Sequence, residues 1–167
     1  GIMPMRGWTS SDKFLMKKLV WTRLSSINSF AISVNGEFTV DSSSFAVGNN
    51  IEYLLAILNS KVILFYFKLG AVIWGKNGIK WFGRYFDNIP IPDVSTEDQS
   101  SIVERVNKIL LITRSDDYFD DTVKQTHVKE FEKQIDQLVY KLYDLTLEEI
   151  AIVEEGKWSM STIFATR

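Results

Sequence analysis

The chain of 167 residues contains no cysteine and a single histidine, His127. Without cysteine it can form no disulfide framework, thiolate metal site or cysteine nucleophile, and we expect a reducing cytoplasm to be its setting. One histidine also excludes a histidine-rich metal cluster. Because His127 lies among polar neighbours within an expected helix, a solvated side chain is favoured over a member of a Ser-His-Asp triad.

The chain also lacks a long uninterrupted apolar run. Residues 53–74 are its most apolar part, but Lys61 and Lys68 interrupt them and Asn59-Ser60 punctuates them. A membrane-spanning helix needs about 20 largely uncharged residues. Residues 1–14 have no apolar core of the kind found in secretory signals. We therefore expect two buried pieces of a soluble fold and no association with a membrane.

Patterns for binding nucleotides and calcium are missing as well. The chain has no G-x-G-x-x-G and no G-x-x-x-x-G-K-[ST] sequence, so nucleotide binding has no support. Four aspartates cluster at positions 116, 117, 120 and 121, without the alternating spacing and central glycine of a calcium loop. An acidic loop that stabilises the start of the next helix through its dipole is favoured instead.

Acidic residues are unevenly distributed, and none occurs between Glu52 and Asp87. Residues 1–92 carry ten Lys and Arg against five Asp and Glu, a net charge of +5. Residues 93–167 carry nine basic residues against sixteen acidic ones, a net charge of −7. Such asymmetry indicates a module that faces a polyanion beside an acidic, solvated one.

The first half has the patterns of a mixed sheet. Residues 17–25, 29–34 and 41–48 are typical of strands, the last of them at a sheet edge or in a loop. Asn35-Gly36 lies between β-formers and predicts a tight hairpin turn, because a type I′ turn needs positive φ at both central positions.

Two apolar segments that follow predict helices. Asn50 is the expected N-cap of a helix over residues 49–60, whose apolar residues recur at helical spacing. Residues 61–69 begin a second helix that is too apolar to be exposed. Beyond Leu69, four glycines break the periodicity and predict a loop or hairpin region.

The segment N-I-P-I-P, residues 88–92, has two prolines spaced by one residue and must be extended. We place a boundary near Asp93. The fold class we expect is α+β, with a small mixed-sheet domain over 1–92, a long antiparallel helical hairpin over 93–155 and a C-terminal tail of no assigned structure over 156–167.

Apolar stripes predict the helices of the second half. Thr96 with Gln99 resembles a capping box that opens a helix of about five turns. A loop over 114–121 leads to a second long helix from Thr122 to Tyr143, and two long helices with a short connection pack as a hairpin. Thr146 and Glu149 form a T-x-x-E capping box before a short helix. The residues of these helices expected to face inward are Ile102, Val103, Val106, Ile109, Leu110, Val128, Phe131, Ile135, Leu138, Val139 and Leu142.

Residues 72–86, V-I-W-G-K-N-G-I-K-W-F-G-R-Y-F, interleave aromatic and basic side chains. One interpretation is a surface that meets phosphates, and the other is aromatic core with a solvated basic face. We expect Val72, Ile73, Ile79, Phe82 and Phe86 in the core. Lys76, Asn77, Lys80 and Arg84 are expected at the surface, and Trp74 and Trp81 are compatible with either place, with Trp81 closer to the surface.

Three runs in this order resemble a known family. Residues 52–68 (E-Y-L-L-A-I-L-N-S-K-V-I-L-F-Y-F-K), 85–110 with I-P-I-P, and 132–154 with I-D-Q-L-V-Y-K-L-Y are similar to the C-terminal specificity domain of type IIG restriction–modification enzymes and related adenine methyltransferases. The junction and the last helix also resemble the target-recognition part of type I specificity subunits. The resemblance covers residues 18–155.

The resemblance implies a domain that reads double-stranded DNA, largely in the major groove. It implies that a separate methyltransferase or endonuclease domain of a parent enzyme is the partner, with S-adenosylmethionine and magnesium as the parent's cofactors. The N-P-P-[YFW] motif of that catalytic domain is absent, since no two of the three prolines are adjacent. We therefore expect a fragment with no cofactor and no catalysis of its own.

Family resemblance supplies no fixed base-contacting motif, so the candidate DNA-binding residues follow from chemistry and position. They are Arg23, Lys68, Lys76, Asn77, Lys80, Trp81 and Arg84. In this interpretation the helices of residues 93–155 form a spacer or docking surface, because their acidity disfavours phosphate. A protein-interaction module that uses the helical hairpin is the alternative function, and the apolar helix faces would also allow a homodimer.

Overall fold

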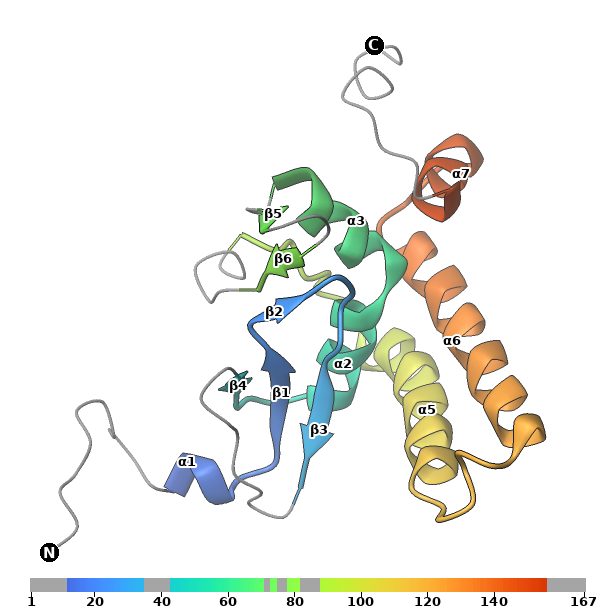
Figure 1. Cartoon of the computed structure of the whole chain (residues 1–167). Coiled ribbons are helices and arrows are strands. Elements are labelled where there is room, and N and C mark those ends of the chain that lie inside the picture. The colour runs from blue at the N-terminus through green and yellow to red at the C-terminus, as the bar shows by residue number, and fades with distance from the viewer. Residues whose placement is uncertain (1–11, 35–42, 71–72, 75–77, 82–87, 156–167) are drawn as a thin grey trace, which may run out of the picture.

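The computed structural model describes residues 12–34, 43–70, 73–74, 78–81 and 88–155, and its architecture is α+β, as the sequence predicts. Figure 1 shows three layers, with the strands on one side, two consecutive helices in the middle, and a long helical hairpin on the other side. A short helix, α1 (Asp12–Leu15), precedes the first strand. No described helix is both long and apolar enough to cross a membrane.

The first sheet is antiparallel and has the order β3-β1-β4. Its central strand β1 (Lys18–Thr22) pairs with β3 (Ala31–Ser33) on one side and with β4 (Ser43–Ala46) on the other. Leu19, opposite both Ile32 and Ala46, is 2% exposed and anchors the sheet in the core. Strands were predicted in all three places, and β4 is an edge strand as expected.

The second sheet has the order β2-β6-β5. In it β6 (Gly78–Lys80) pairs antiparallel with β2 (Leu24–Ser25) and with β5 (Ile73–Trp74). The strand predicted over 17–25 therefore divides at Arg23, because Thr22 is the last residue paired with β4 whereas Leu24 already pairs with Lys80. The pairing of β5 with β6 confirms a hairpin beyond Leu69.

Helices α2 (Ile51–Asn59) and α3 (Lys61–Gly70) form the middle layer. They are separated at Ser60, whose backbone is extended with ψ 156° and whose hydroxyl donates to the Ile57 carbonyl at 2.6 Å. Asn50 occupies the N-cap position as predicted, but its side chain caps no amide. With φ at 53° the residue is left-handed, and its Nδ2 donates to Oε1 of Gln99 at 2.9 Å instead.

The helical hairpin consists of α5 (Thr96–Thr113) and α6 (Thr122–Leu142), which run antiparallel and contact each other (Figure 1). The start of α5 differs from the prediction by one residue. Ser95, not Thr96, is the N-cap, and its hydroxyl accepts the N–H of Asp98 at 3.2 Å. Asp121 caps α6 by accepting two backbone N–H groups, so the acidic loop contributes to the start of this helix by direct hydrogen bonds, whereas the sequence predicted an effect through the helix dipole.

A short helix, α7 (Leu147–Glu155), follows the hairpin. Its predicted capping box is present in both directions. The Thr146 N–H donates to Oε2 of Glu149 at 2.8 Å, and the Glu149 N–H donates to the Thr146 hydroxyl at 3.3 Å.

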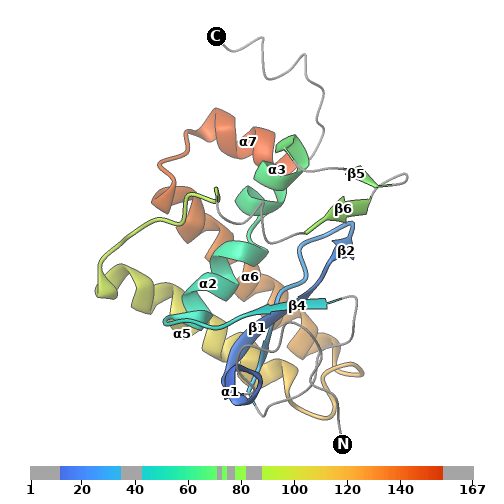
Figure 2. The same ribbon diagram turned by 90° about the vertical axis from the view of Figure 1, so that its left-hand side faces the viewer.

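The two halves share one core. Figure 2 views the molecule from the strand side, with β1 and β4 in front of α2 and the hairpin behind it. Buried residues of α2 and α3 belong to the same apolar cluster as Ile102, Val106, Ile135 and Val139 of the hairpin. The expected inward stripe is therefore correct at its centre, while Val103, Ile109, Leu110, Leu138 and Leu142 are partly buried against this cluster.

The predicted Asn35-Gly36 turn and the tail over 156–167 are among the features that lie outside the described residues.

Candidate nucleic-acid interface

Three of the predicted DNA-binding cations lie in or next to the second sheet and at the end of its neighbour α3. Lys80 lies in β6, and alternation along the strand places it opposite to Ile79 and Trp81, which are 3% and 1% exposed. Its cross-strand partner Leu24 is 48% exposed, so this side of the β2–β6 pair faces solvent. Lys80 itself is half-buried.

Arg23 and Lys68 lie on elements next to Lys80. The Arg23 carbonyl accepts the Trp81 N–H at 2.9 Å, which places Arg23 beside the end of β6. Lys68 is exposed in the last turn of α3, and this end of α3 lies beside β5 and β6 in both ribbon views (Figures 1 and 2). The elements that carry the three cations are thus brought together by the fold, although the residues span positions 23 to 80.

The prediction that the Trp81 indole faces DNA is wrong. It is 1% exposed and packs against Phe67 and Phe30, with ring centroids 4.2 and 5.6 Å away. Its Nε1 donates to the Ser25 carbonyl at 3.3 Å, and its own carbonyl accepts Nε1 of Trp21 at 3.1 Å. The ring is a core anchor with its polar edge satisfied, so it cannot stack on a base. The period-two spacing from buried Ile79 was the pattern that could have predicted this.

The remaining residues predicted for this surface are not all described. Lys76, Asn77 and Arg84 lie outside the described residues, as do Val72, Phe82 and Phe86 of the expected core, and the side chains of Ile73 and Trp74 are not described. Ile79 is buried, which confirms its predicted place in the core.

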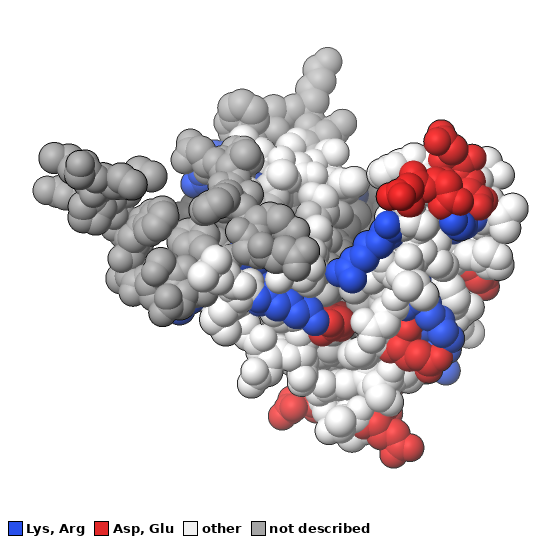
Figure 3. All heavy atoms as spheres, turned by 90° about the horizontal axis from the view of Figure 1, so that it is seen from below, with Lys and Arg blue, Asp and Glu red and all other residues white. Residues whose placement is uncertain are grey.

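The helical half of the sequence carries most of the acidic side chains. Seen from below, acidic side chains gather over the right-hand part of the face, on the side of the helical hairpin, with basic side chains between them (Figure 3). The turn between α5 and α6, with its four aspartates, lies at the far end of the molecule from β5 and β6 in both ribbon views. This separation follows the +5 and −7 division of the sequence.

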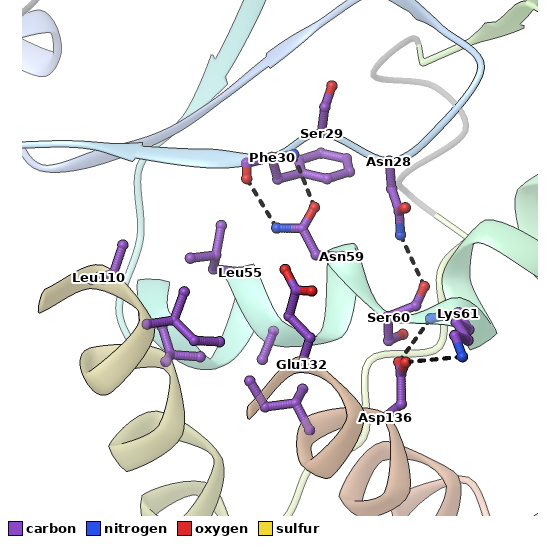
Figure 4. Close-up of a pocket in the computed structure, with 14 residues that line it drawn as sticks. Asn28, Ser29, Phe30, Leu55, Asn59, Ser60, Lys61, Leu110, Glu132 and Asp136 are labelled. Atoms are coloured by element: carbon purple, nitrogen blue, oxygen red, sulfur yellow. Dashed lines mark hydrogen bonds and ion pairs between the residues drawn. The ribbon is translucent and has the colours of Figure 1, made fainter. Parts of the chain in front are cut away.

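A cavity of about 450 Å³ lies where segment 28–30 meets α2, α5 and α6 (Figure 4). The sequence analysis missed its polar residues. Asn59, which looked like punctuation in an apolar run, holds the backbone of Phe30 with two hydrogen bonds, of 2.9 and 3.0 Å. Asn28 donates to the carbonyls of Leu58 and Ser60 at 3.0 and 2.9 Å.

An ionic cluster borders the same cavity at the start of α3. Asp136 of α6 is 7% exposed and accepts the backbone N–H of Lys61 at 3.0 Å, so a side chain of the hairpin caps α3. The Lys61 ammonium lies 3.9 Å from Asp136 and also pairs with Glu154 of α7. Burial raises the pKa of Asp136 above its ordinary value, and the attraction of Lys61 only partly offsets it.

Tyr140 and Glu154 complete this cluster. The Tyr140 hydroxyl donates to Glu154 at 2.8 Å, and burial raises the pKa of Tyr140. The hydrogen bond from Lys61 lowers the pKa of Glu154. The cluster therefore consists of a neutral tyrosine, a lysine ammonium and carboxylates already paired, and it serves to join α3, α6 and α7. Among the described residues, no three acidic or histidine side chains lie close enough together to hold a metal ion.

Comparison with known proteins identifies no relative: no protein-family model matches the chain, and no curated protein is significantly similar to it in sequence.

Proposed function

We propose that the chain is a DNA-recognition domain of a restriction–modification enzyme, which positions a separate methyltransferase or endonuclease domain on its target. The observation that carries the proposal is that Lys80 in β6, Arg23 just before β2 and Lys68 at the adjoining end of α3 lie on neighbouring segments, far from the acidic hairpin turn. The resemblance of the three runs supports it, since those runs form most of α2 and α3, the junction before α5, most of α5, and the greater parts of α6 and α7.

The chemistry assigned to this surface is phosphate binding. Lys and Arg side chains that neutralise phosphates release condensed counterions, which supplies affinity that does not depend on sequence. Such contacts fix the register of the protein on the duplex, and side chains at base edges supply the discrimination. Methyl transfer with S-adenosylmethionine, and any cleavage with magnesium, are assigned to the parent's separate catalytic domain.

The test is binding of the chain to duplex DNA over a range of salt concentrations. We expect affinity to fall steeply as salt rises, with the double variant Lys68→Ala/Lys80→Ala reducing the slope of log K against log [salt] by about 2. Lys141→Ala, an exposed lysine in the last turn of α6, is the matched control and should leave the slope unchanged. An affinity that is insensitive to salt would refute the proposal.

A second test concerns the candidate residues outside the described part of the chain. Lys76→Ala should weaken binding to all sequences about equally, as loss of a phosphate contact does. Arg84→Ala or Asn77→Ala should relax the preference at one base position, which methylation mapping in the full-length enzyme would detect. Unchanged specificity in both variants would remove these two residues as base readers.

An alternative function, a protein-interaction module, is favoured by one observation. Leu111, Phe119 and Val123, around the turn of the hairpin, are 77%, 83% and 62% exposed. The centre of the hairpin's inward stripe is buried within the chain, so this turn is an apolar surface of the hairpin that a homodimer or another partner could use. Phe119→Asp should then abolish partner binding without unfolding the protein, whereas Leu138→Asp would disturb the core.

A further inference from the structure

The cavity between segment 28–30 and helices α2, α5 and α6 has the size and wall chemistry of a ligand site. Its volume of about 450 Å³ falls within the usual range for small-molecule pockets. The walls contributed by the three helices are mainly apolar, from Leu55, Ala56, Val106, Ile109, Leu110 and Ile135.

Hydrogen-bond donors around this cavity are already used within the protein. The Asn59 amide group donates to the Phe30 carbonyl, and that of Asn28 donates to two carbonyls at the end of α2. The Lys61 N–H donates to Asp136, and the Lys61 ammonium pairs with Glu154. Few donors therefore remain from which a ligand could accept a hydrogen bond.

Acceptor capacity, in contrast, remains available. Glu132 of α6 points its carboxylate into the space below Phe30 and Asn59 (Figure 4). Among the described residues it has no hydrogen-bond or ion-pair partner, and Lys129 attracts it only at longer range. Glu132 is an exposed residue, and partial desolvation together with the nearby charge of Asp136 raises its pKa.

From this imbalance we infer that the cavity binds a small organic cation, an ammonium or guanidinium group carried on an apolar body. The cation pairs with Glu132 at the mouth of the cavity, and the apolar body lies against the helix walls. An anionic ligand would meet the carboxylates of Glu132 and Asp136, and a purely apolar one would gain nothing from the Glu132 carboxylate. This inference does not depend on the proposed DNA recognition.

The experiment is an NMR titration of the full chain with 2-phenylethylamine, which is protonated at neutral pH. We expect saturable shifts of the Asn28 and Asn59 side-chain amides and of the Ala56 backbone amide, with a dissociation constant of about 10 mM or tighter for a probe of this size. The neutral analogue 2-phenylethanol should bind at least about tenfold more weakly, since it lacks the charge.

Two variants of α6 separate the cavity from general charge effects. Glu132→Gln should weaken binding of the amine at least about tenfold, while Glu130→Gln, the same change at an exposed position two residues away, should alter it by less than about twofold. Circular dichroism checks that both variants are folded. Equal binding of the amine and the alcohol, unchanged affinity in Glu132→Gln, or no saturable shift at the cavity amides would overturn the inference.

Discussion

At the scale of single residues, Asn59 replaces a missing neighbouring strand. Phe30 precedes the edge strand β3, and its N–H and C=O both face the Asn59 amide, which accepts from one and donates to the other. A primary amide has the same donor and acceptor pair as a peptide group, so it can satisfy a sheet edge. The contact joins the end of α2 to the first sheet.

We predict that Asn59→Ala lowers the free energy of unfolding by about 1–2 kcal/mol, because both Phe30 backbone groups lose their partner. Urea denaturation measures the change. Asn107→Ala on the exposed face of α5 is the control and should have an effect within about 0.5 kcal/mol. Equal stability of the two variants would show that water replaces the Asn59 contact without cost.

Asp136 is a second residue that joins distant elements, and its contribution to stability depends on its protonation. Because burial raises its pKa above the ordinary 3.8, the folded protein takes up a proton there more readily than the unfolded chain. Protonation therefore favours the folded state. We predict that the stability of the wild type relative to Asp136→Asn rises as the pH falls from neutral through the raised pKa toward 3.8, as urea denaturation at several pH values would measure.

Two features sharpen this prediction. Glu132, Lys61 and Glu154 also face Asp136 and are present in both proteins, so the comparison reports position 136 together with its effect on Glu132, whose pKa the Asp136 charge raises in the same direction. Asparagine can still accept the Lys61 N–H, whereas Asp136→Ala leaves the first amide of α3 without its partner and should cost about 1–3 kcal/mol at neutral pH. A stability difference between wild type and Asp136→Asn that does not vary with pH would contradict the raised pKa.

At the scale of elements, the junction of α6 and α7 is held by backbone chemistry on both sides. After α6, the Leu145 N–H returns to the Tyr140 carbonyl at 3.0 Å, and Asp144 is left-handed with φ 52°. Left-handed residues that end helices are usually glycine, because a Cβ atom is strained there. An acidic side chain at this end also opposes the helix dipole.

We predict that Asp144→Gly raises the free energy of unfolding by about 0.5–1 kcal/mol, by relieving both costs. Asp144→Val should lower it by more than 1 kcal/mol, roughly the cost of a β-branched residue in this conformation. Thermal denaturation of the two variants decides the matter. A stabilising Val or a destabilising Gly would contradict the left-handed conformation at this position.

The capping box of α7 supports a companion prediction. Thr146→Ala removes the acceptor for the Glu149 N–H and should cost about 1 kcal/mol, while Thr146→Ser keeps the hydroxyl and should be nearly neutral. Urea denaturation would measure both changes. Equal stability of the two variants would mean that the box contributes nothing at this helix start.

At the scale of the whole molecule, the shared core makes the halves interdependent. Buried residues of α2 pack in one cluster with Val106, Ile135 and Val139, and Asp136 caps α3 from the hairpin. A fragment that ends at Pro92 would expose this face of α2 to water. Exposing several large aliphatic side chains costs about 1.5–3 kcal/mol each, which exceeds what a small domain can spare.

We predict that the full chain unfolds in urea as one cooperative unit and that the fragment 1–92 alone does not fold. Four of the five tryptophans precede residue 82 and none lies in 93–155, so fluorescence reports mainly the sheet half and far-UV circular dichroism mainly the helices. Coincident midpoints from the two probes would support one unit. Separate midpoints, or a folded 1–92 fragment, would show two independent domains.

The sequence by itself determined the elements whose causes are local. The helices of the hairpin, the break between α2 and α3, and the Thr146–Glu149 capping box follow from periodicity and from side chains within four residues of each other. The opposite charges of the two halves are likewise a property of the residues alone. In these places a short-range interaction decides the structure, so a short window of sequence contains the information.

Only the tertiary structure decided the features that depend on contacts across the chain. It divided one expected strand between two sheets at Arg23, buried Trp81 between Phe30 and Phe67, and made Asp136 a cap for α3. Trp81 shows the reason. An indole beside lysines is equally suited to water and to a core, and the choice depends on whether distant segments supply a partner for its N–H and an apolar surface for its ring.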